Sequence, residues 1–269
     1  MSPEELDRFL KRFNDDTDAA IAAIRQHARA KRSFSASPRI SASRPVGKTL
    51  VSVRSLGKKY KVGRHTVQAL TNVTCEVHEG EFLVITAPSG SGKSTLLQLM
   101  GGLDKPTNGS VTVDGVDLSS LSDSRLSEFR SHTIGFVFQF FYLQPFLSLE
   151  RNLELPGIFA HTKRQERQAR AKELAATVGI GDKLGYLPKE LSGGQIQRAA
   201  IIRALLNSPK IILADEPTGN LDRANSVGII DLFEQIRQTL GTAIVIATHD
   251  TAIAERADRV ISLQDGAIV

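Results

Sequence analysis

From residue 50 onward, short apolar runs alternate with longer stretches that are apolar along one helical face. The apolar runs predict strands at 50–56, 67–77, 81–87, 109–114, 134–138, 210–214, 243–248 and 259–263. The intervening stretches predict helices, notably at 93–101, 163–179, 194–206 and 223–239. This alternation predicts an α/β domain with a largely parallel sheet. No helix interrupts 50–87, so we expect a small antiparallel portion there.

The first 48 residues follow a different pattern and predict a separate segment, leaving 49–269 as the main domain. Apolar residues recur at near-helical spacing over 3–30, which predicts an N-terminal helix, and the stretch 28–48 is rich in Ser, Arg and Pro. Such a composition buries too little surface to offset chain entropy, so we interpret 28–48 as a linker. Residues 25–48 sum to about +7, which favours contact with an anionic membrane or a regulator. A plain solvated extension is the alternative.

Composition narrows the class of protein. The 269 residues carry a net charge of +5, but most of it lies in 25–48, so nucleic-acid binding by the main domain is not expected. No apolar run reaches the roughly 18–20 residues of a membrane span, and the acidic start lacks the apolar core of a secretory signal. The single cysteine, Cys75, excludes an internal disulfide framework. A cytoplasmic protein is expected.

The run EFLVITAPSGSGKSTLLQLM at 81–100 predicts a strand, a glycine-rich turn and a helix in succession. Backbone N–H groups of such a turn, with the positive end of the helix, form a cradle for phosphate oxygens. Lys93 can reach the β and γ phosphates of a nucleotide, and Ser94 is placed to ligate Mg²⁺. The predicted nucleotide-binding residues here are Ser89, Gly90, Ser91, Gly92, Lys93, Ser94 and Thr95. Ala87 departs from the strict pattern, which has glycine at that position.

A second motif, KIILADEP at 210–217, places two carboxylates directly after an apolar strand. Open α/β sheets bind ligands at the carboxyl ends of their strands. Asp215 is therefore expected to hold Mg²⁺, directly or through water, and Glu216 to polarise the water that attacks the γ-phosphate. The two motifs together predict an ATPase.

A third motif, LSGGQIQRAAIIRALL at 191–206, opens another helix with Ser192, Gly193, Gly194 and Gln195. Its N-terminal N–H groups and the Ser192 hydroxyl predict a second phosphate site. One triphosphate does not easily reach two helix N-termini of one compact chain. A second copy that contributes this loop across a two-fold interface is the simpler arrangement.

These three motifs, in this order over about residues 50–269, resemble the ATP-binding cassette (ABC) ATPases. The resemblance implies the P-loop cassette fold, with a parallel core sheet, an antiparallel β subdomain and a helical subdomain, and ATP with Mg²⁺ as cofactors. It implies that Tyr60 stacks on adenine, that Gln139 senses Mg²⁺ and couples the site to a membrane permease, and that Asp222 lies at the dimer interface. It also implies that His249 contacts the γ-phosphate as a catalytic residue beside Glu216 and Lys93.

Three finer stretches, at 101–111, 134–156 and 214–222, resemble the branch that energises macrolide-export, lipoprotein-release and cell-division permeases. The aromatic residues Phe140, Phe141, Tyr142 and Phe146 could line the groove that receives a permease helix, or simply pack in the core. The sequence that follows Gln139 differs from the one usual in that branch. A dimer that closes on ATP and drives a permease from the cytoplasmic face of the membrane is the function implied.

Two functions of other classes stay open at this point. The first is a cassette ATPase outside transport, for which salt-dependent binding of DNA or RNA would be the sign. The second is a regulatory module that binds ATP without turning it over, for which Ala87 leaves some room.

Overall fold

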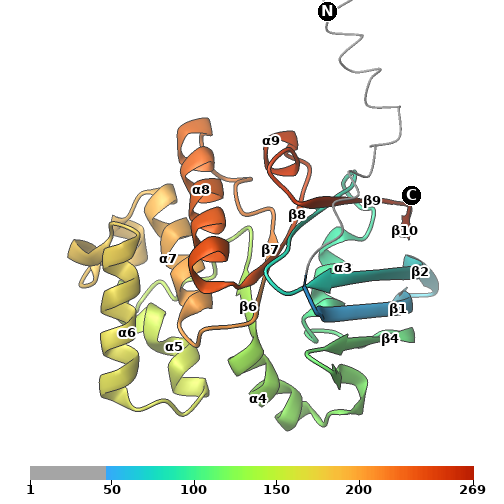
Figure 1. Ribbon diagram of the computed structural model, residues 1–269, viewed down its shortest axis with the longest axis horizontal. Coiled ribbons are helices and arrows are strands. Elements are labelled where there is room, and N and C mark those ends of the chain that lie inside the picture. The colour runs from blue at the N-terminus through green and yellow to red at the C-terminus, as the bar shows by residue number, and fades with distance from the viewer. Residues whose placement is uncertain (1–46) are drawn as a thin grey trace, which may run out of the picture. The chain divides into compact units, whose positions relative to one another are not determined.

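The computed structural model describes residues 47–269, and two sheets organise this part of the chain (Figure 1). The first sheet is antiparallel, with strand order β2-β1-β4-β5. Its strands are β1 (Thr49–Val62), β2 (His65–His78), β4 (Asn108–Val113) and β5 (Val116–Asp117). The predicted antiparallel portion is thus present. A helix and a linker were predicted ahead of this sheet. Residues 1–46, which make up nearly all of them, lie outside the described part of the chain. The domain boundary between residues 48 and 49 therefore stays a prediction.

The second sheet is the parallel core, with strand order β10-β9-β3-β8-β7-β6. Its parallel strands are β3 (Phe82–Thr86), β6 (Ile134–Val137), β7 (Ile211–Asp215), β8 (Ala243–Thr248) and β9 (Arg259–Gln264), and the short β10 (Ala267–Ile268) pairs antiparallel at the edge. The inclusion of 81–87 in the antiparallel portion was wrong. A helix follows β3 directly, and such a crossover leads to a parallel partner.

Seven α-helices connect and cover the strands in the described residues. They are α3 (Lys93–Met100), α4 (Asp123–Thr133), α5 (Leu149–Phe159), α6 (Arg164–Thr177), α7 (Gly193–Leu205), α8 (Arg223–Leu240) and α9 (Thr251–Ala254). The four helices expected from the pattern are all present. The pattern did not reveal α4, which buries only Leu126 and Thr133, or α5, which contains Pro156. The periodic signal of α4 is weak, Pro156 breaks the helical pattern of α5 in the sequence, and α9 is a single turn.

The helices cover opposite faces of the core sheet. Leu83 and Ile85 of β3 pack with Leu96 and Leu99 of α3 in one cluster of buried residues. The alternate residues of the same strand face a second cluster, which contains the buried side chains of α7 and α8. In Figure 1, α5, α6 and α7 lie on the left of the core sheet, while α3 and the antiparallel sheet lie on the right. The helix that follows the glycine-rich turn and the LSGGQ helix are therefore on different sides of the sheet.

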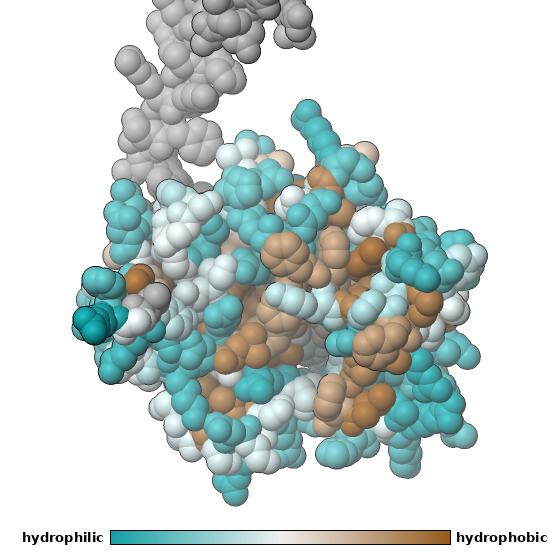
Figure 2. All heavy atoms as spheres, turned by 180° about the vertical axis from the view of Figure 1, so that it is seen from behind, coloured by the Kyte–Doolittle hydropathy of each residue, from teal (hydrophilic) through white to brown (hydrophobic). Residues whose placement is uncertain are grey.

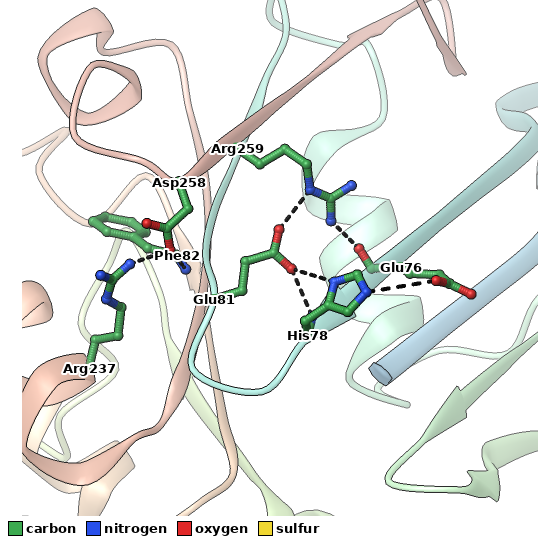
Figure 3. Close-up of polar contacts among 7 residues, drawn as sticks. All are labelled: Glu76, His78, Glu81, Phe82, Arg237, Asp258 and Arg259. Carbon is green, nitrogen blue, oxygen red and sulfur yellow. Dashed lines mark hydrogen bonds and ion pairs between the residues drawn. The ribbon is translucent and has the colours of Figure 1, made fainter. Parts of the chain in front are cut away.

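A buried carboxylate joins the two sheets at the start of β3 (Figure 3). Glu81 accepts from the backbone N–H of His78 at 2.7 Å, lies 3.2 Å from His78 Nδ1, and accepts from Arg259 Nε at 2.7 Å. Arg259 also donates to the carbonyl of Glu76 in β2. Because Glu81 is almost wholly buried, these partners are what allow its charge to remain in the interior. The network fixes the entry of β3, whose other end leads into the glycine-rich turn.

None of the helices in residues 47–269 is long and apolar enough to cross a lipid bilayer.

Candidate functional site

The glycine loop, residues 87–95, leaves the carboxyl end of β3 and leads into α3. Gly90 and Gly92 both adopt left-handed backbone conformations, with φ of 82° and 94°. Gly92 is the residue before the first turn of α3, and an added Cβ there would lie 2.5 Å from the carbonyl oxygen of Ala69. Glycine is thus required at 92 both by backbone conformation and by the neighbouring strand. The loop presents the N-terminus of α3 as the sequence predicted.

Replacing Gly92 with alanine is expected to destabilise the protein by about 1–3 kcal/mol and to weaken ATP binding, because the backbone must move away from Ala69. Gly90→Ala is the matched control, since it has the same left-handed strain but nothing within 4 Å of the added Cβ. Thermal unfolding and nucleotide titration of both variants test this. Equal losses in the two variants would show that the contact with Ala69 contributes nothing.

Lys93 lies under the glycine loop with its side chain almost wholly buried. Its ammonium donates to the carbonyl of Ala87 at 2.7 Å and to that of Pro88 at 3.3 Å, and lies 3.8 Å from Glu216 Oε1. The methyl group of Ala87 packs within the first core cluster. The departure from glycine at 87 is accommodated there, and the carbonyl of that residue is a hydrogen-bond acceptor for the lysine.

Glu216 lies just beyond β7 in a left-handed conformation, φ 44°, with a mostly buried side chain. Its Oε2 accepts a hydrogen bond from Thr248 Oγ1 at 2.9 Å, and its Oε1 lies 2.9 Å from His249 Nδ1. The His249 side chain is 74% exposed, so it borders the site from the solvent side. The structure therefore brings Glu216, His249 and Lys93 together. The sequence interpretation did not include Thr248, although it directly precedes His249 at the end of β8.

Asp215 and Ser94 form the pair of residues suited to Mg²⁺. The Asp215 Oδ1 atom is buried with no hydrogen-bond partner, as expected of an oxygen that needs a further ligand. Burial raises the pKa of Asp215, and a hydrogen bond with Ser94 opposes that shift. In residues 47–269, no group of three or more His, Cys, Asp or Glu side chains is arranged so that it could hold a metal ion without further ligands. The arrangement fits a Mg²⁺ ion held by Ser94, Asp215 and the phosphate oxygens of a nucleotide, because Mg²⁺ is commonly bound by few protein oxygens.

Gln139 follows β6 and is tied to the segment after Glu216. Asn220 Nδ2 donates to the main-chain carbonyl of Gln139 at 2.8 Å. The Gln139 side-chain amide lies close to Gly219, where an added Cβ would be 3.5 Å from Nε2. Gln139 thus borders the acidic end of β7. Its role as the residue that senses Mg²⁺ stays a prediction.

Tyr60 lies in β1, opposite Val67 of β2. Its hydroxyl donates to Asp104 Oδ2 at 2.8 Å, and the Lys58 ammonium lies 4.9 Å from its ring centroid. Asp104 and Lys58 were not identified from the sequence. Tyr60 is separated from Asp104 by 44 residues, and no local spacing links them.

The signature loop, residues 191–195, begins α7 on the face of the sheet opposite α3. Ser192 caps this helix by accepting from the N–H of Gln195 at 3.4 Å, while Gln195 Oε1 accepts from the N–H of Ser192 at 2.9 Å. An added Cβ at Gly194 would lie 2.5 Å from Asn225 Oδ1. Asn225 in turn donates to Asp222 at the start of α8, so the signature loop and Asp222 share one surface.

The aromatic segment 140–146 after Gln139 is mostly on the surface, which contradicts the core-packing alternative for three of its members. Phe140, Tyr142 and Phe146 are 67%, 61% and 75% exposed. Phe159, at the end of α5, is 74% exposed. Seen from behind, in Figure 2, brown hydrophobic residues gather on the side of the molecule that carries α5, α6 and α7. Apolar exposure of this kind is typical of an interaction site.

Arg203 of α7 holds the backbone of this segment. It donates from one guanidinium nitrogen to the carbonyl of Phe141 at 2.7 Å and from the other to that of Tyr142. Phe141 and Tyr142 both have left-handed backbones, with φ of 59° and 48°. A half-buried arginine thus connects the signature helix to a strained, exposed aromatic loop.

Comparisons with known proteins agree with this geometry. The model of the ABC transporter family matches residues 70–219. The chain is 46% identical to the Bacillus subtilis ABC transporter ATP-binding protein YvrO, over 82% of this chain and 96% of that protein. It is 45% identical to the lipoprotein-releasing system ATP-binding protein LolD of a Shewanella species, over 81% of this chain and 94% of that protein. A dimeric structure of the cassette MJ0796 in a post-hydrolysis state, bound to ADP and Pi, superposes with a TM-score of 0.76 at 42% identity, covering 81% of this chain and 96% of that chain.

The chain belongs to the ABC transporter ATP-binding family. Members of this family bind ATP with Mg²⁺, hydrolyse it as dimers and drive a membrane permease, and this assigns an ABC ATPase subunit to the chain. The family, the cassette fold and the ATPase class predicted from the sequence are confirmed. In this ABC cassette, a single chain holds a glycine loop and a signature loop on opposite faces of its core sheet.

Proposed function

We propose that two copies of this chain close on two ATP molecules, each bound between the glycine loop of one copy and the signature loop of the other. The observation that carries this is the placement of α3 and α7 on opposite faces of the core sheet, each with an exposed N-terminal loop. The N-termini of α3 and α7 can each bind phosphate, but in one chain they face different directions. Both are used when a second copy supplies the signature loop to the nucleotide on the glycine loop of the first. Ser192 and Gly193 are exposed at the helix end, as a contribution to the partner's nucleotide requires.

In the proposed mechanism Lys93 and the N-terminus of α3 neutralise the phosphates, and Glu216 accepts a proton from the attacking water. Thr248 and His249 hold the two oxygens of Glu216 in place from 2.9 Å, which orients the carboxylate before the reaction. Mg²⁺ supplies charge neutralisation at the transferred phosphoryl group when it is bound at Ser94 and Asp215. Loss of the γ-phosphate removes the link between the two copies, and the dimer opens.

We further propose that the permease binds the aromatic segment 140–146 and that the chain acts on the cytoplasmic face of a membrane. The exposed Phe140, Tyr142 and Phe146 form an apolar surface directly after Gln139, which borders the acidic end of β7. Relatives include LolD, named for lipoprotein release, and a macrolide export ATP-binding/permease protein MacB of Rhodopirellula baltica, 44% identical over 81% of this chain and 32% of MacB. A permease of this branch, which receives a mechanical stroke from its cassettes, fits the resemblance.

Introducing a charge at Phe146 tests the permease surface. Phe146→Asp is expected to lower the amount of cassette bound to membrane vesicles that contain the permease by about tenfold, because a carboxylate would be desolvated at an apolar contact. Basal ATPase activity of the free cassette should stay at the wild-type rate. Leu240→Asp, which adds the same charge at an exposed apolar position at the end of α8, is the matched control and should bind as wild type does. Unchanged membrane binding of the Phe146 variant would remove this surface from the proposal.

A further inference from the structure

The hydroxyl of Tyr60 is fixed by a carboxylate outside the three sequence motifs. Asp104 Oδ2 accepts from Tyr60 at 2.8 Å, and Asp104 Oδ1 accepts from the Lys58 ammonium at 2.7 Å. Burial alone would raise the pKa of Asp104, but the hydrogen bonds from Lys58 and Tyr60 outweigh it and hold that pKa below its usual value. Both oxygens of an ionised carboxylate are thereby used, one of them for the tyrosine.

Lys58 contacts both Asp104 and the ring of Tyr60. It is buried, donates a second hydrogen bond to the carbonyl of Lys105 at 2.6 Å, and places its ammonium 4.9 Å from the Tyr60 ring centroid. A cation at that distance from an aromatic ring is attracted to it. The Tyr60 ring is therefore held both at its hydroxyl and by the charge of Lys58, which leaves it few alternative rotamers.

The segment that supplies Asp104 follows α3, so it is continuous with the glycine loop. It is also bound to β1, because the N–H of Thr107 donates to the carbonyl of Gly57 at 2.9 Å and Thr107 Oγ1 accepts from the N–H of Lys59 at 3.0 Å. One stretch of chain therefore begins at the predicted phosphate cradle and returns to the strand that carries Tyr60. This fixes the position of the ring relative to the cradle.

The surroundings of Tyr60 suit a planar base. Val67 lies directly opposite Tyr60 in the β1–β2 register, so the two side chains share one face of the sheet, and Val67 is 51% exposed. A ring with a fixed orientation beside an exposed aliphatic side chain is a stacking surface that needs little rearrangement when a ligand binds.

We propose that Asp104 is a positioning residue for nucleotide binding, which holds the Tyr60 ring in the orientation that stacks on adenine. This inference rests on the role proposed for Tyr60 as the base-stacking residue. Asp104 lies after α3 and outside the glycine loop, so we expect it to act on the nucleoside part of the ligand alone.

Calorimetric titration of the full chain with Mg-ADP and with Mg-pyrophosphate tests the inference, because pyrophosphate fills the cradle without a base. Asp104→Ala is expected to raise the Kd for ADP about five- to tenfold, within the net worth of one ordinary hydrogen bond, and to leave the Kd for pyrophosphate unchanged. Tyr60→Phe should give a loss of similar size, and the double variant should lose no more than either single one. Asp104→Asn, which keeps an oxygen that can accept from Tyr60, should restore part of the affinity.

The control is Asp123→Asn, which removes an exposed carboxylate that binds the side chain of Lys105 but has no contact with Tyr60. It should bind both ligands as wild type does. An equal loss for ADP and pyrophosphate in Asp104→Ala would mean damage to the loop and would overturn the positioning role. If Tyr60→Ala lost affinity for ADP and Asp104→Ala did not, the positioning role of Asp104 would also be overturned, and Tyr60 would remain the stacking residue. No loss of ADP affinity in Tyr60→Ala would overturn both that role and the inference.

Discussion

Replacing Glu216 with glutamine is expected to lower the ATPase rate by about 10²–10⁴-fold and to accumulate an ATP-bound dimer. Glutamine keeps the size of the side chain and an oxygen that can accept from Thr248, which donates to Glu216 at 2.9 Å in the structure. It cannot take a proton from the attacking water. Binding of ATP should therefore proceed while the step that opens the dimer is blocked.

Phosphate release in the presence of Mg-ATP measures the ATPase rate. Light scattering with and without Mg-ATP measures the molecular mass, which distinguishes monomer from dimer. The wild type should be mostly monomeric with slow turnover, and the variant should be dimeric only when Mg-ATP is present. Glu255→Gln, at an exposed position, is the control for loss of a negative charge and should match the wild type. A Glu216 variant that hydrolyses at the wild-type rate and stays monomeric would show that Glu216 is not the general base. The chain would then be better described as a nucleotide-sensing module.

The motifs that bind phosphate were predictable because each is local in sequence. A strand, a glycine-rich turn and a helix follow one another over 81–100, so neighbouring residues alone were enough to predict the turn in which Gly90 and Gly92 lie. The same is true of Glu216, which ends an apolar strand. Local signals of this kind need no knowledge of which strands pair.

The contacts that orient these residues were not predictable, because they join distant parts of the chain. Thr248 and Glu216 are 32 residues apart, and Asp104 and Tyr60 are 44 apart. They meet only because β7 lies beside β8 and because the segment after α3 returns to β1. Assigning β3 to the wrong sheet has the same origin, since strand order depends on crossovers that a single strand does not encode.

Mixing two inactive variants is expected to restore ATPase activity, which tests whether the site is shared between copies. Lys93→Met removes the cationic group of the glycine loop but keeps its buried stem. Gly193→Asp places a carboxylate at the signature loop, where it repels the triphosphate of the partner. Each variant alone should lose at least about 10²-fold in rate, the scale of removing one electrostatic contributor. The structure favours Gly193 over Gly194 for this purpose: an added Cβ at 193 makes only an ordinary contact with Leu221, whereas at 194 it would collide with Asn225.

In a mixed dimer the intact glycine loop of the Gly193→Asp chain meets the intact signature loop of the Lys93→Met chain. Random pairing of equal amounts gives half mixed dimers with one complete site of two, so activity should rise to about a quarter of the wild-type rate. Measuring the rate against the ratio of the two variants should give a maximum at equal amounts. A rate that never exceeds the sum of the separate variants would mean that the two loops do not serve one nucleotide across identical copies. The signature loop would then have to act on a different chain, because α3 and α7 lie on opposite faces of the core sheet and leave no shared site within one copy.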